Sequence, residues 1–135
     1  MIDNIQPHIW GSSFWKTIHY VTLSYPNNPD NIHKENAKNF IFSLSNVLPC
    51  EKCRLHFKDH LQSFNDSVLE SKKSFVLWGF NVHNTVNKQN NKRMLTFAEF
   101  QNLYENNIQP TNNRKYYIII LIIILIIFYY RFYIF

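Results

Sequence analysis

The apolar residues between Ile9 and Asn107 recur at helical spacing, and this pattern constrains the fold more than any other feature of the chain. In the segment 30–48, one face of a helix would carry Ala37, Phe40, Ile41, Leu44, Val47 and Leu48. Glycine occurs twice in 135 residues, which argues against a turn-rich β fold. The sequence therefore predicts an all-α protein.

Prolines and asparagines divide this region into short helices. Pro26-Asn27-Asn28-Pro29 ends a first helix, and Pro49 separates a second helix from a third. Thr96 and Glu99 form a plausible capping box at the start of a fifth, short helix. The expected helices span about residues 9–25, 30–48, 50–64, 74–87 and 96–106. We expect a four-helix bundle with a short fifth helix, as one domain over 1–107.

Residues 116–135 form an apolar run that only Arg131 interrupts. As a helix, about 20 residues cover roughly 30 Å, close to the thickness of one hydrocarbon core. Tyrosines near both ends and Arg131 near the far end suit the two membrane interfaces. We expect a transmembrane anchor over 116–135, preceded by a linker over 108–115. The isoleucine content leaves a buried strand of a soluble core as the alternative.

Charge gives the expected orientation of this anchor. Arg114 and Lys115 lie just before the span, so the positive-inside rule favours a single-pass tail anchor with the domain in the cytosol. Because few charges decide this orientation, lumenal exposure stays an alternative. Residues 1–7 are polar and predict no signal peptide. The net charge of +5 is spread without a basic run, so we expect no nucleic-acid partner.

The only two cysteines, Cys50 and Cys53, follow Pro49 in a Cys-x-x-Cys pair at the expected start of a helix. Helix N–H groups there favour thiolates, and Lys52 and Arg54 add positive charge. With no further cysteine, a structural disulfide framework is not expected. The pair is a redox centre, half of a metal site, or two ordinary thiols.

A zinc site would use Cys50, Cys53, His56 and His60 as its ligands. All four residues would lie on one helix, whereas a tetrahedral site normally needs a turn between its ligand pairs. The metal reading is therefore disfavoured. A thioredoxin-type site is also disfavoured, because no βαβ pattern precedes the pair.

Two further clusters carry polar and aromatic side chains. Gly11, Trp15 and His19 share one helix stripe, where a flat group could approach the glycine and stack on the tryptophan. The alternative is that Trp15 packs in the core and His19 lies at the surface. His83 and Asn87 project from one face of the fourth helix and could contact a ring with heteroatoms along its edge. Surface asparagines in an asparagine-rich chain are the alternative there.

Together the three clusters resemble the Erv/ALR family of FAD-linked sulfhydryl oxidases. The resemblance covers about residues 9–104. It is carried by Trp10-Gly11-Ser12-Ser13-Phe14-Trp15-Lys16-Thr17-Ile18-His19, Leu48-Pro49-Cys50-Glu51-Lys52-Cys53, and Trp78 with His83-Asn84-Thr85-Val86-Asn87 and Lys92.

The resemblance implies a helical bundle, usually a homodimer, that holds FAD at the mouth of its four-helix core. The residues it places at the flavin are Gly11, Ser12, Trp15 and His19 from the first helix and His83, Asn84, Val86 and Asn87 from the fourth, with His56, Trp78 and Tyr104 as neighbours and Lys92 at the phosphates. Ser12 departs from the arginine that many relatives have at this position.

The resemblance also implies an activity, an FAD-dependent thiol oxidase that makes protein disulfides. A substrate dithiol would attack the Cys50–Cys53 disulfide at Cys50, which is expected nearer the outside. Cys53 would face the flavin, and O2 would take the electrons as hydrogen peroxide.

The chain lacks the second, shuttle Cys-x-x-Cys of most cellular relatives. We therefore expect a separate dithiol protein, such as a thioredoxin- or glutaredoxin-like carrier, as electron donor. Such minimal forms resemble the oxidases of large cytoplasmic DNA viruses, which would place the chain at a virion or host membrane. A tail-anchored structural or adaptor protein without flavin is one alternative, and a Cys/His zinc-binding module is the other.

Overall fold

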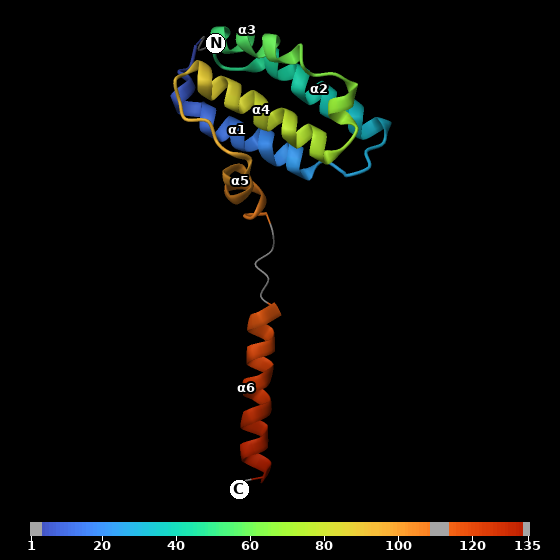
Figure 1. The fold of residues 1–135 in the computed structure, drawn as a ribbon, viewed down its shortest axis with the longest axis vertical. Helices are drawn as coiled ribbons and strands as arrows, with labels where there is room; N and C mark the ends of the chain where they lie inside the picture. Colours follow the sequence, from blue (N-terminus) through green and yellow to red (C-terminus); the bar gives the residue numbers. More distant parts are fainter. Residues whose placement is uncertain (1–3, 109–113, 134–135) are drawn as a thin grey trace. The chain divides into compact units, whose positions relative to one another are not determined.

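The structure, a computed structural model, describes residues 4–108 and 114–133. Its helices are α1 (Pro7–Ser24), α2 (Asn31–Val47), α3 (Glu51–Leu61), η1 (Asp66–Leu69), α4 (Lys72–Gln89), α5 (Phe97–Phe100), η2 (Gln101–Glu105) and α6 (Arg114–Tyr133) (Figure 1). These described ranges contain no strand, so the all-α prediction is confirmed. The chain divides into two compact units, residues 1–105 and 106–135.

Side-chain caps fix where the helices begin. The Asp30 carboxylate accepts the His33 N–H at 2.8 Å and opens α2. Ser71 caps α4 in a capping box with Ser74. Thr96 and Glu99 make the capping box that the sequence predicted at the start of α5. Each cap satisfies N–H groups that a helix end leaves without an internal partner.

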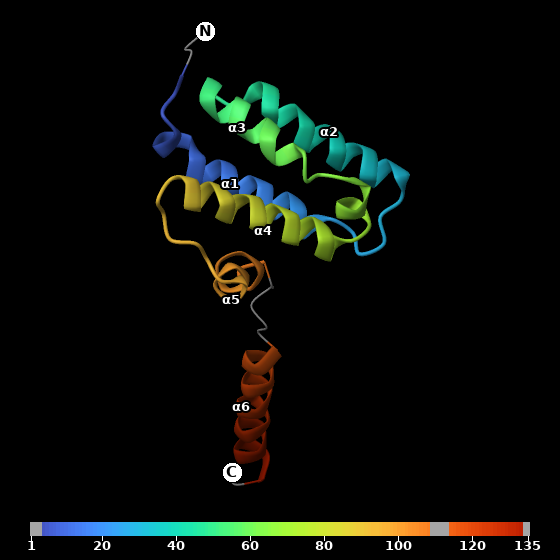
Figure 2. The same ribbon diagram turned by 45° about the horizontal axis from the view of Figure 1, so that its top comes forward.

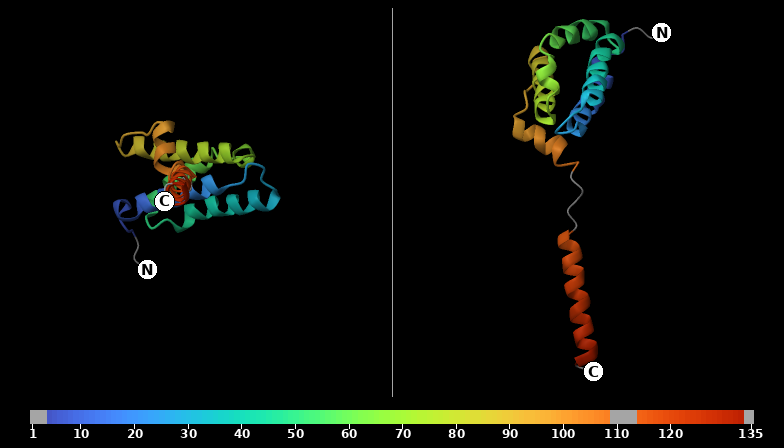
Figure 3. Two further views of the ribbon diagram at one scale, coloured as in Figure 1. Left: turned by 90° about the horizontal axis from the view of Figure 1, so that it is seen from below. Right: turned by 90° about the vertical axis from the view of Figure 1, so that its right-hand side faces the viewer.

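The first unit is built from two antiparallel helix pairs, α1 with α4 and α2 with α3 (Figures 1 and 2). The pairs enclose one core, in which Ile41 and Phe75 are fully buried and Ile18 is 1% exposed. Figure 3 shows the pairs from below and from the side. Val47, expected in this core, is 66% exposed; α2 ends at that residue.

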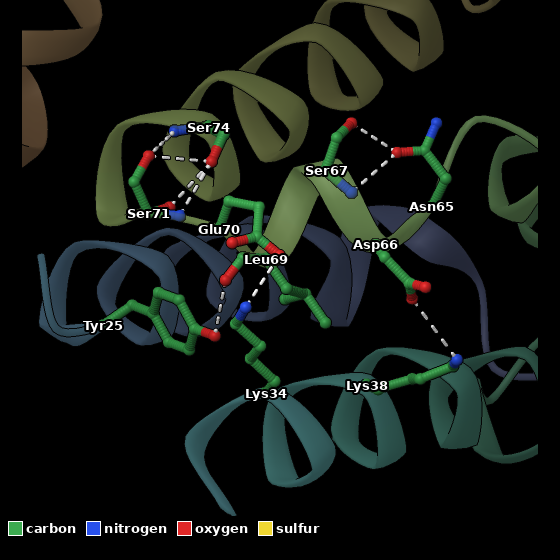
Figure 4. A network of polar contacts seen from close by, with 10 residues as sticks. All are labelled: Tyr25, Lys34, Lys38, Asn65, Asp66, Ser67, Leu69, Glu70, Ser71 and Ser74. Atoms are coloured by element: carbon green, nitrogen blue, oxygen red, sulfur yellow. Dashed lines mark hydrogen bonds and ion pairs between the residues drawn. The ribbon is translucent and has the colours of Figure 1, made fainter. Parts of the chain in front are cut away.

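The connection between α3 and α4 contains a short 3-10 helix, η1, which the sequence pattern did not predict (Figure 4). The Tyr25 hydroxyl donates to the Leu69 carbonyl at 3.0 Å and ties η1 to the end of α1. Lys34 of α2 lies 2.7 Å from the Glu70 carboxylate. These contacts hold the end of the bundle farthest from the cysteine pair.

The fifth helix differs in form from the prediction. An α-helical turn, α5, continues into a π-helical segment, η2, over Gln101–Glu105. Phe100 is 1% exposed and packs in a second apolar cluster with Leu23 and Val76. This cluster fixes α5 and η2 beside α1 and α4, where Tyr104 reaches the candidate site.

The second unit contains α6, an apolar helix of 20 residues. In the part of the chain that the structure describes, no helix is long and apolar enough to cross a membrane, so the transmembrane helix expected over 116–135 is not found. Residues 134 and 135 and most of the expected linker, 109–113, lie outside the described residues.

Candidate active site

Cys50 and Cys53 form a disulfide at the N-terminus of α3, with their Cα atoms 5.1 Å apart. Cys50 is the N-cap residue, and its sulfur accepts the Cys53 N–H at 3.2 Å. Pro49 precedes the cap and has no N–H that would need a partner. Of the three readings that the sequence left open, the structure selects a disulfide at a helix N-terminus, where released thiolates are stabilised.

The relative exposure of the two cysteines differs from the prediction. Cys50 is 6% exposed, whereas Cys53 is half-buried against the core. The expectation that Cys50 lies nearer the outside is therefore wrong. The reason is local, because Cys50 lies in the tight turn between α2 and α3, while Cys53 lies in the first turn of α3 itself.

Aromatic and imidazole rings gather between α1 and α4. The Trp15 and His83 rings stack with centroids 4.2 Å apart and planes 8° apart. His19 Nε2 lies 2.8 Å from His83 Nδ1. The Tyr104 ring lies against His19 at 4.6 Å, and Phe100 packs edge-on against the same ring at 4.9 Å. The structure thus brings together four predicted site residues, and it adds Phe100, which no sequence signal singled out.

Burial keeps both histidines of this cluster neutral at pH 7. Burial, together with the smaller effect of the nearby His83, lowers the pKa of His19 to about 3. Burial and, to a lesser extent, the positive charge of Lys92 together lower the pKa of His83 to about 4. His19 is not a surface residue, as one reading of the sequence had it, since its side chain is 0% exposed.

The hydrogen bond between the histidines indicates their tautomers. Within the described residues, His19 Nδ1 is buried and has no hydrogen-bond partner. A bare acceptor nitrogen is tolerated better there than a bare N–H, so His19 carries its proton on Nε2 and donates to His83 Nδ1. His83 then carries its proton on Nε2 and can donate to a bound group.

Two other predicted residues have protein partners. The Asn84 amide nitrogen donates to the Leu95 carbonyl at 2.8 Å, and its oxygen accepts the Leu95 N–H at 2.9 Å. Asn84 therefore ties the segment after α4 to that helix. Trp78 is buried in the core and donates its indole N–H to the Ser63 hydroxyl at 3.1 Å.

The remaining predicted residues are more open to solvent. Ser12, His56 and Lys92 are exposed, and Gly11, Val86 and Asn87 are half-buried. Lys92 is held close to α4 because its N–H donates to the Asn87 carbonyl at 2.8 Å. Asn91, in the left-handed region with φ of 54°, makes the turn that allows this return.

The residues present fit FAD. A Cβ placed on Gly11 would meet nothing within 4 Å, so a ring can approach the α1 backbone there. One turn along, the half-buried Trp15–His83 stack offers an aromatic face. Lys92 supplies positive charge beside His83 for the phosphates. These three features together suit a ligand that has a flat aromatic group and an attached anion.

The zinc site considered above would need Cys50 and Cys53 as thiolate ligands. Both cysteine sulfurs are engaged in the disulfide, which leaves neither as a thiolate ligand. The described residues contain no grouping of three or more His, Cys, Asp or Glu side chains that could hold a metal ion.

Comparison with known proteins agrees with this site. A probable FAD-linked sulfhydryl oxidase of Acanthamoeba polyphaga mimivirus is 38% identical over an alignment of 108 residues that covers 78% of this chain and 76% of that protein. An FAD-linked sulfhydryl oxidase of African swine fever virus is 34% identical over 102 residues, 76% of this chain and 85% of that protein. The FAD binding domain of Erv1 from Saccharomyces cerevisiae superposes with a TM-score of 0.69 at 26% identity, covering 76% of this chain and 97% of that domain.

A sequence model of the Erv1/Alr family matches residues 12–106, which is well over half of the chain. The match spans α1 through η2 and so contains the cysteine pair and the whole ring cluster. The chain belongs to the Erv1/Alr family.

Proposed function

We propose that the protein is an FAD-dependent thiol oxidase that forms disulfides in a partner protein. The observation that carries the proposal is the Cys50–Cys53 disulfide at a helix N-terminus, in the same domain as the Trp15–His83 stack. The names of the viral relatives, FAD-linked sulfhydryl oxidases, support the same activity.

The chain's own residues divide the work of binding. Gly11 leaves room for the cofactor at α1, and Trp15 and His83 form the aromatic face. The His83 Nε2–H would be available to donate to a heteroatom of the cofactor, and Lys92 would be available to pair with a phosphate. FAD held there would supply two-electron transfer from the reduced cysteine pair to O2, which with two protons gives hydrogen peroxide.

The thiol chemistry belongs to the cysteines. A substrate thiolate attacks one sulfur of the Cys50–Cys53 bond, forms a mixed disulfide and releases the other sulfur as a thiolate. The second substrate thiolate then attacks the substrate sulfur of the mixed disulfide. The substrate leaves as a disulfide, and its two electrons remain on the cysteine pair.

The test is purification of the full chain in a mild detergent. We expect the visible absorbance of an oxidised flavin, oxygen uptake that requires an added dithiol, and one hydrogen peroxide formed for each O2 consumed. A protein that stays colourless after incubation with FAD and consumes no oxygen would contradict the proposal. That outcome would favour the structural or adaptor alternative.

We propose further that α6 anchors the domain to a membrane, with the domain on the cytosolic side. Support comes from the side chains between Tyr117 and Phe132, which are apolar or aromatic except for Arg131 and lie at the surface of their helix. The apolar run over 116–135, part of which lies outside the described residues, has the length of about 20 residues that a helix needs to span a hydrocarbon core.

Alkaline carbonate extraction tests the attachment, since an anchored chain stays in the membrane pellet whereas a chain ending at residue 107 is released. For orientation, Asn65-Asp66-Ser67 is an exposed glycosylation acceptor sequence. A cytosolic domain leaves Asn65 unmodified, whereas an acceptor sequence appended after Phe135 is glycosylated in the lumen. Glycosylation of Asn65 would show that the domain lies in the lumen and would contradict the proposed orientation.

The electron donor in this proposal is a separate dithiol protein, such as a thioredoxin- or glutaredoxin-like carrier. The two cysteines of the chain pair with each other, so the sequence holds no second pair to act as a shuttle. We expect a higher kcat/KM with such a carrier than with dithiothreitol. We also propose a homodimer, in line with the family resemblance, and light scattering on the purified protein tests that state.

A further inference from the structure

The turn Leu48-Pro49-Cys50, which joins α2 to the redox helix α3, has its three carbonyls bonded. Arg54 Nη1 donates to the Leu48 carbonyl at 2.6 Å. The Arg54 backbone N–H donates to the Cys50 carbonyl at 3.0 Å. On the other side, the Ile5 N–H donates to the Pro49 carbonyl at 2.8 Å. Arg54 thus provides two of these three bonds, one of them from its side chain.

The N-terminal segment that supplies the third bond is itself braced. The Trp10 indole N–H donates to the Ile5 carbonyl at 3.0 Å. Trp10 in turn packs on Phe14 and on the core cluster. This bond to Pro49 comes from the main chain, so Arg54 is the position where a side-chain substitution can release the turn.

The charge of Arg54 is directed at this turn and at no carboxylate. Arg54 is half-buried, and Leu48, whose carbonyl it binds, is 4% exposed. Within the described residues, no carboxylate lies within 4.0 Å of the Arg54 guanidinium, although Glu51 lies on the same helix one turn earlier. A guanidinium without a carboxylate partner is therefore held on the carbonyl two residues before Cys50, and its residue directly follows Cys53 in the chain.

We propose that Arg54 is a positioning residue for the Cys50–Cys53 pair. Its side chain holds the turn that brings Cys50 to the N-cap of α3, and its bond to the Leu48 carbonyl fixes a positive charge on that turn. Reduction of the disulfide by two electrons produces thiolate, which that charge stabilises, whereas the disulfide is uncharged. Arg54 therefore shifts the equilibrium of the pair toward the dithiol. The role in turnover depends on the proposed oxidase function, but the equilibrium itself does not.

The test measures the cysteine pair directly. The full chain is equilibrated without oxygen in buffers of reduced and oxidised dithiothreitol, and the two thiols are then counted by alkylation and mass spectrometry. Arg54→Gln should move the equilibrium constant toward the disulfide by about tenfold, which is about 30 mV for a two-electron couple. At pH 7 the reduced variant should also react more slowly with iodoacetamide, and the pH profile of that reaction should move upward.

Two matched variants separate position from charge alone. Lys52→Gln removes an equal charge between the cysteines, but Lys52 is exposed, so we expect a shift of about twofold or less. Arg54→Lys keeps the charge and should recover most of the equilibrium constant. If Arg54→Gln does not fold, Arg54→Met keeps the apolar stem and carries the same expectation.

An equilibrium constant in Arg54→Gln equal to that of the parent overturns the proposal. Equal shifts in Arg54→Gln and Lys52→Gln also overturn it, because general charge would then explain the effect. Flavin absorbance is read on the same samples. A protein without flavin in which Arg54→Gln still shifts the equilibrium refutes the oxidase function and leaves the role of Arg54 standing.

Discussion

His19 Nε2 lies 2.8 Å from His83 Nδ1, and this contact joins α1 to α4 beneath the stacked Trp15 ring. Both imidazoles are held neutral by burial. The contact is therefore a neutral hydrogen bond that depends on one tautomer of each ring. Protonation of His83 at Nδ1 would replace it by two N–H groups that face each other, whereas a second proton on His19 would have to go to its buried Nδ1, which has no hydrogen-bond partner among the described residues.

Stability should fall as the pH drops from about 6.5 toward 4. The pKa of each histidine rises from about 3 or 4 in the folded state to its ordinary 6.5 on unfolding, so the unfolded chain takes up protons that the folded chain refuses. Between pH 7 and pH 5 this costs up to about 2 kcal/mol for buried His19 and less for half-exposed His83. Urea unfolding at a series of pH values measures the loss.

Substitutions assign this pH dependence to the pair. His19→Gln removes one of the two groups, so the loss of stability between pH 7 and pH 5 should shrink. His8→Gln is the control, because His8 is exposed at the start of α1 and far along the helix from His19. An unchanged pH dependence in His19→Gln would count against this account.

The two glycines of the chain provide a matched pair. A Cβ at Gly79 would lie 3.4 Å from Thr22 Cγ2, an ordinary contact, and a Cβ at Gly11 would meet nothing. Each Gly→Ala change should therefore raise the unfolding free energy of the flavin-free protein by about 0.5–1 kcal/mol through helix propensity. Denaturant unfolding measures both.

The same two glycine variants should differ in their affinity for FAD. Gly11→Ala narrows the space assigned to the cofactor and should weaken FAD binding. Gly79→Ala adds a methyl inside the contact between α1 and α4, where it would meet Thr22, Ile18 and His19 Nδ1 at 3.4–4.0 Å, and should weaken FAD binding less. Fluorescence titration with FAD gives both affinities. If Gly11→Ala binds FAD as tightly as the parent protein, Gly11 does not line the FAD site.

Tyr25→Phe should destabilise the bundle by about 1–2 kcal/mol, because it leaves the buried Leu69 carbonyl without its donor. Tyr20→Phe is the control, since Tyr20 is 42% exposed and its change should stay within about 0.5 kcal/mol. Equal unfolding free energies for the two variants would show that the hydroxyl contact contributes nothing.

Helix periodicity was a sufficient guide to the secondary structure of the bundle. Ala37, Ile41 and Leu44 are buried on the predicted face of α2, and the capping box of Thr96 and Glu99 opens α5 as expected. Periodicity could not find η1, which is too short to show a period and is held by the tertiary bond from Tyr25 to Leu69.

The sequence was enough to name candidate residues for the site, but not the hydrogen-bond partners of those residues. Trp15, His19 and His83, which the family resemblance assigns to the flavin, lie in contact with one another. The burial of Cys50 and the bond from Arg54 to the Leu48 carbonyl depend on the path of the turn, which no local spacing encodes. For the same reason the sequence could not show whether the Asn84 amide binds a ligand or the backbone. In the structure its partner is the Leu95 backbone.

The central claim is that substrate electrons pass through the Cys50–Cys53 disulfide to FAD. Oxygen uptake driven by a dithiol, measured on the full chain and on Cys50→Ser and Cys53→Ser, tests it most directly. We predict that each serine variant keeps its flavin absorbance and loses all but about a thousandth of the activity, a change of about 4 kcal/mol in barrier. Oxygen uptake at the parent rate in either variant would contradict the account.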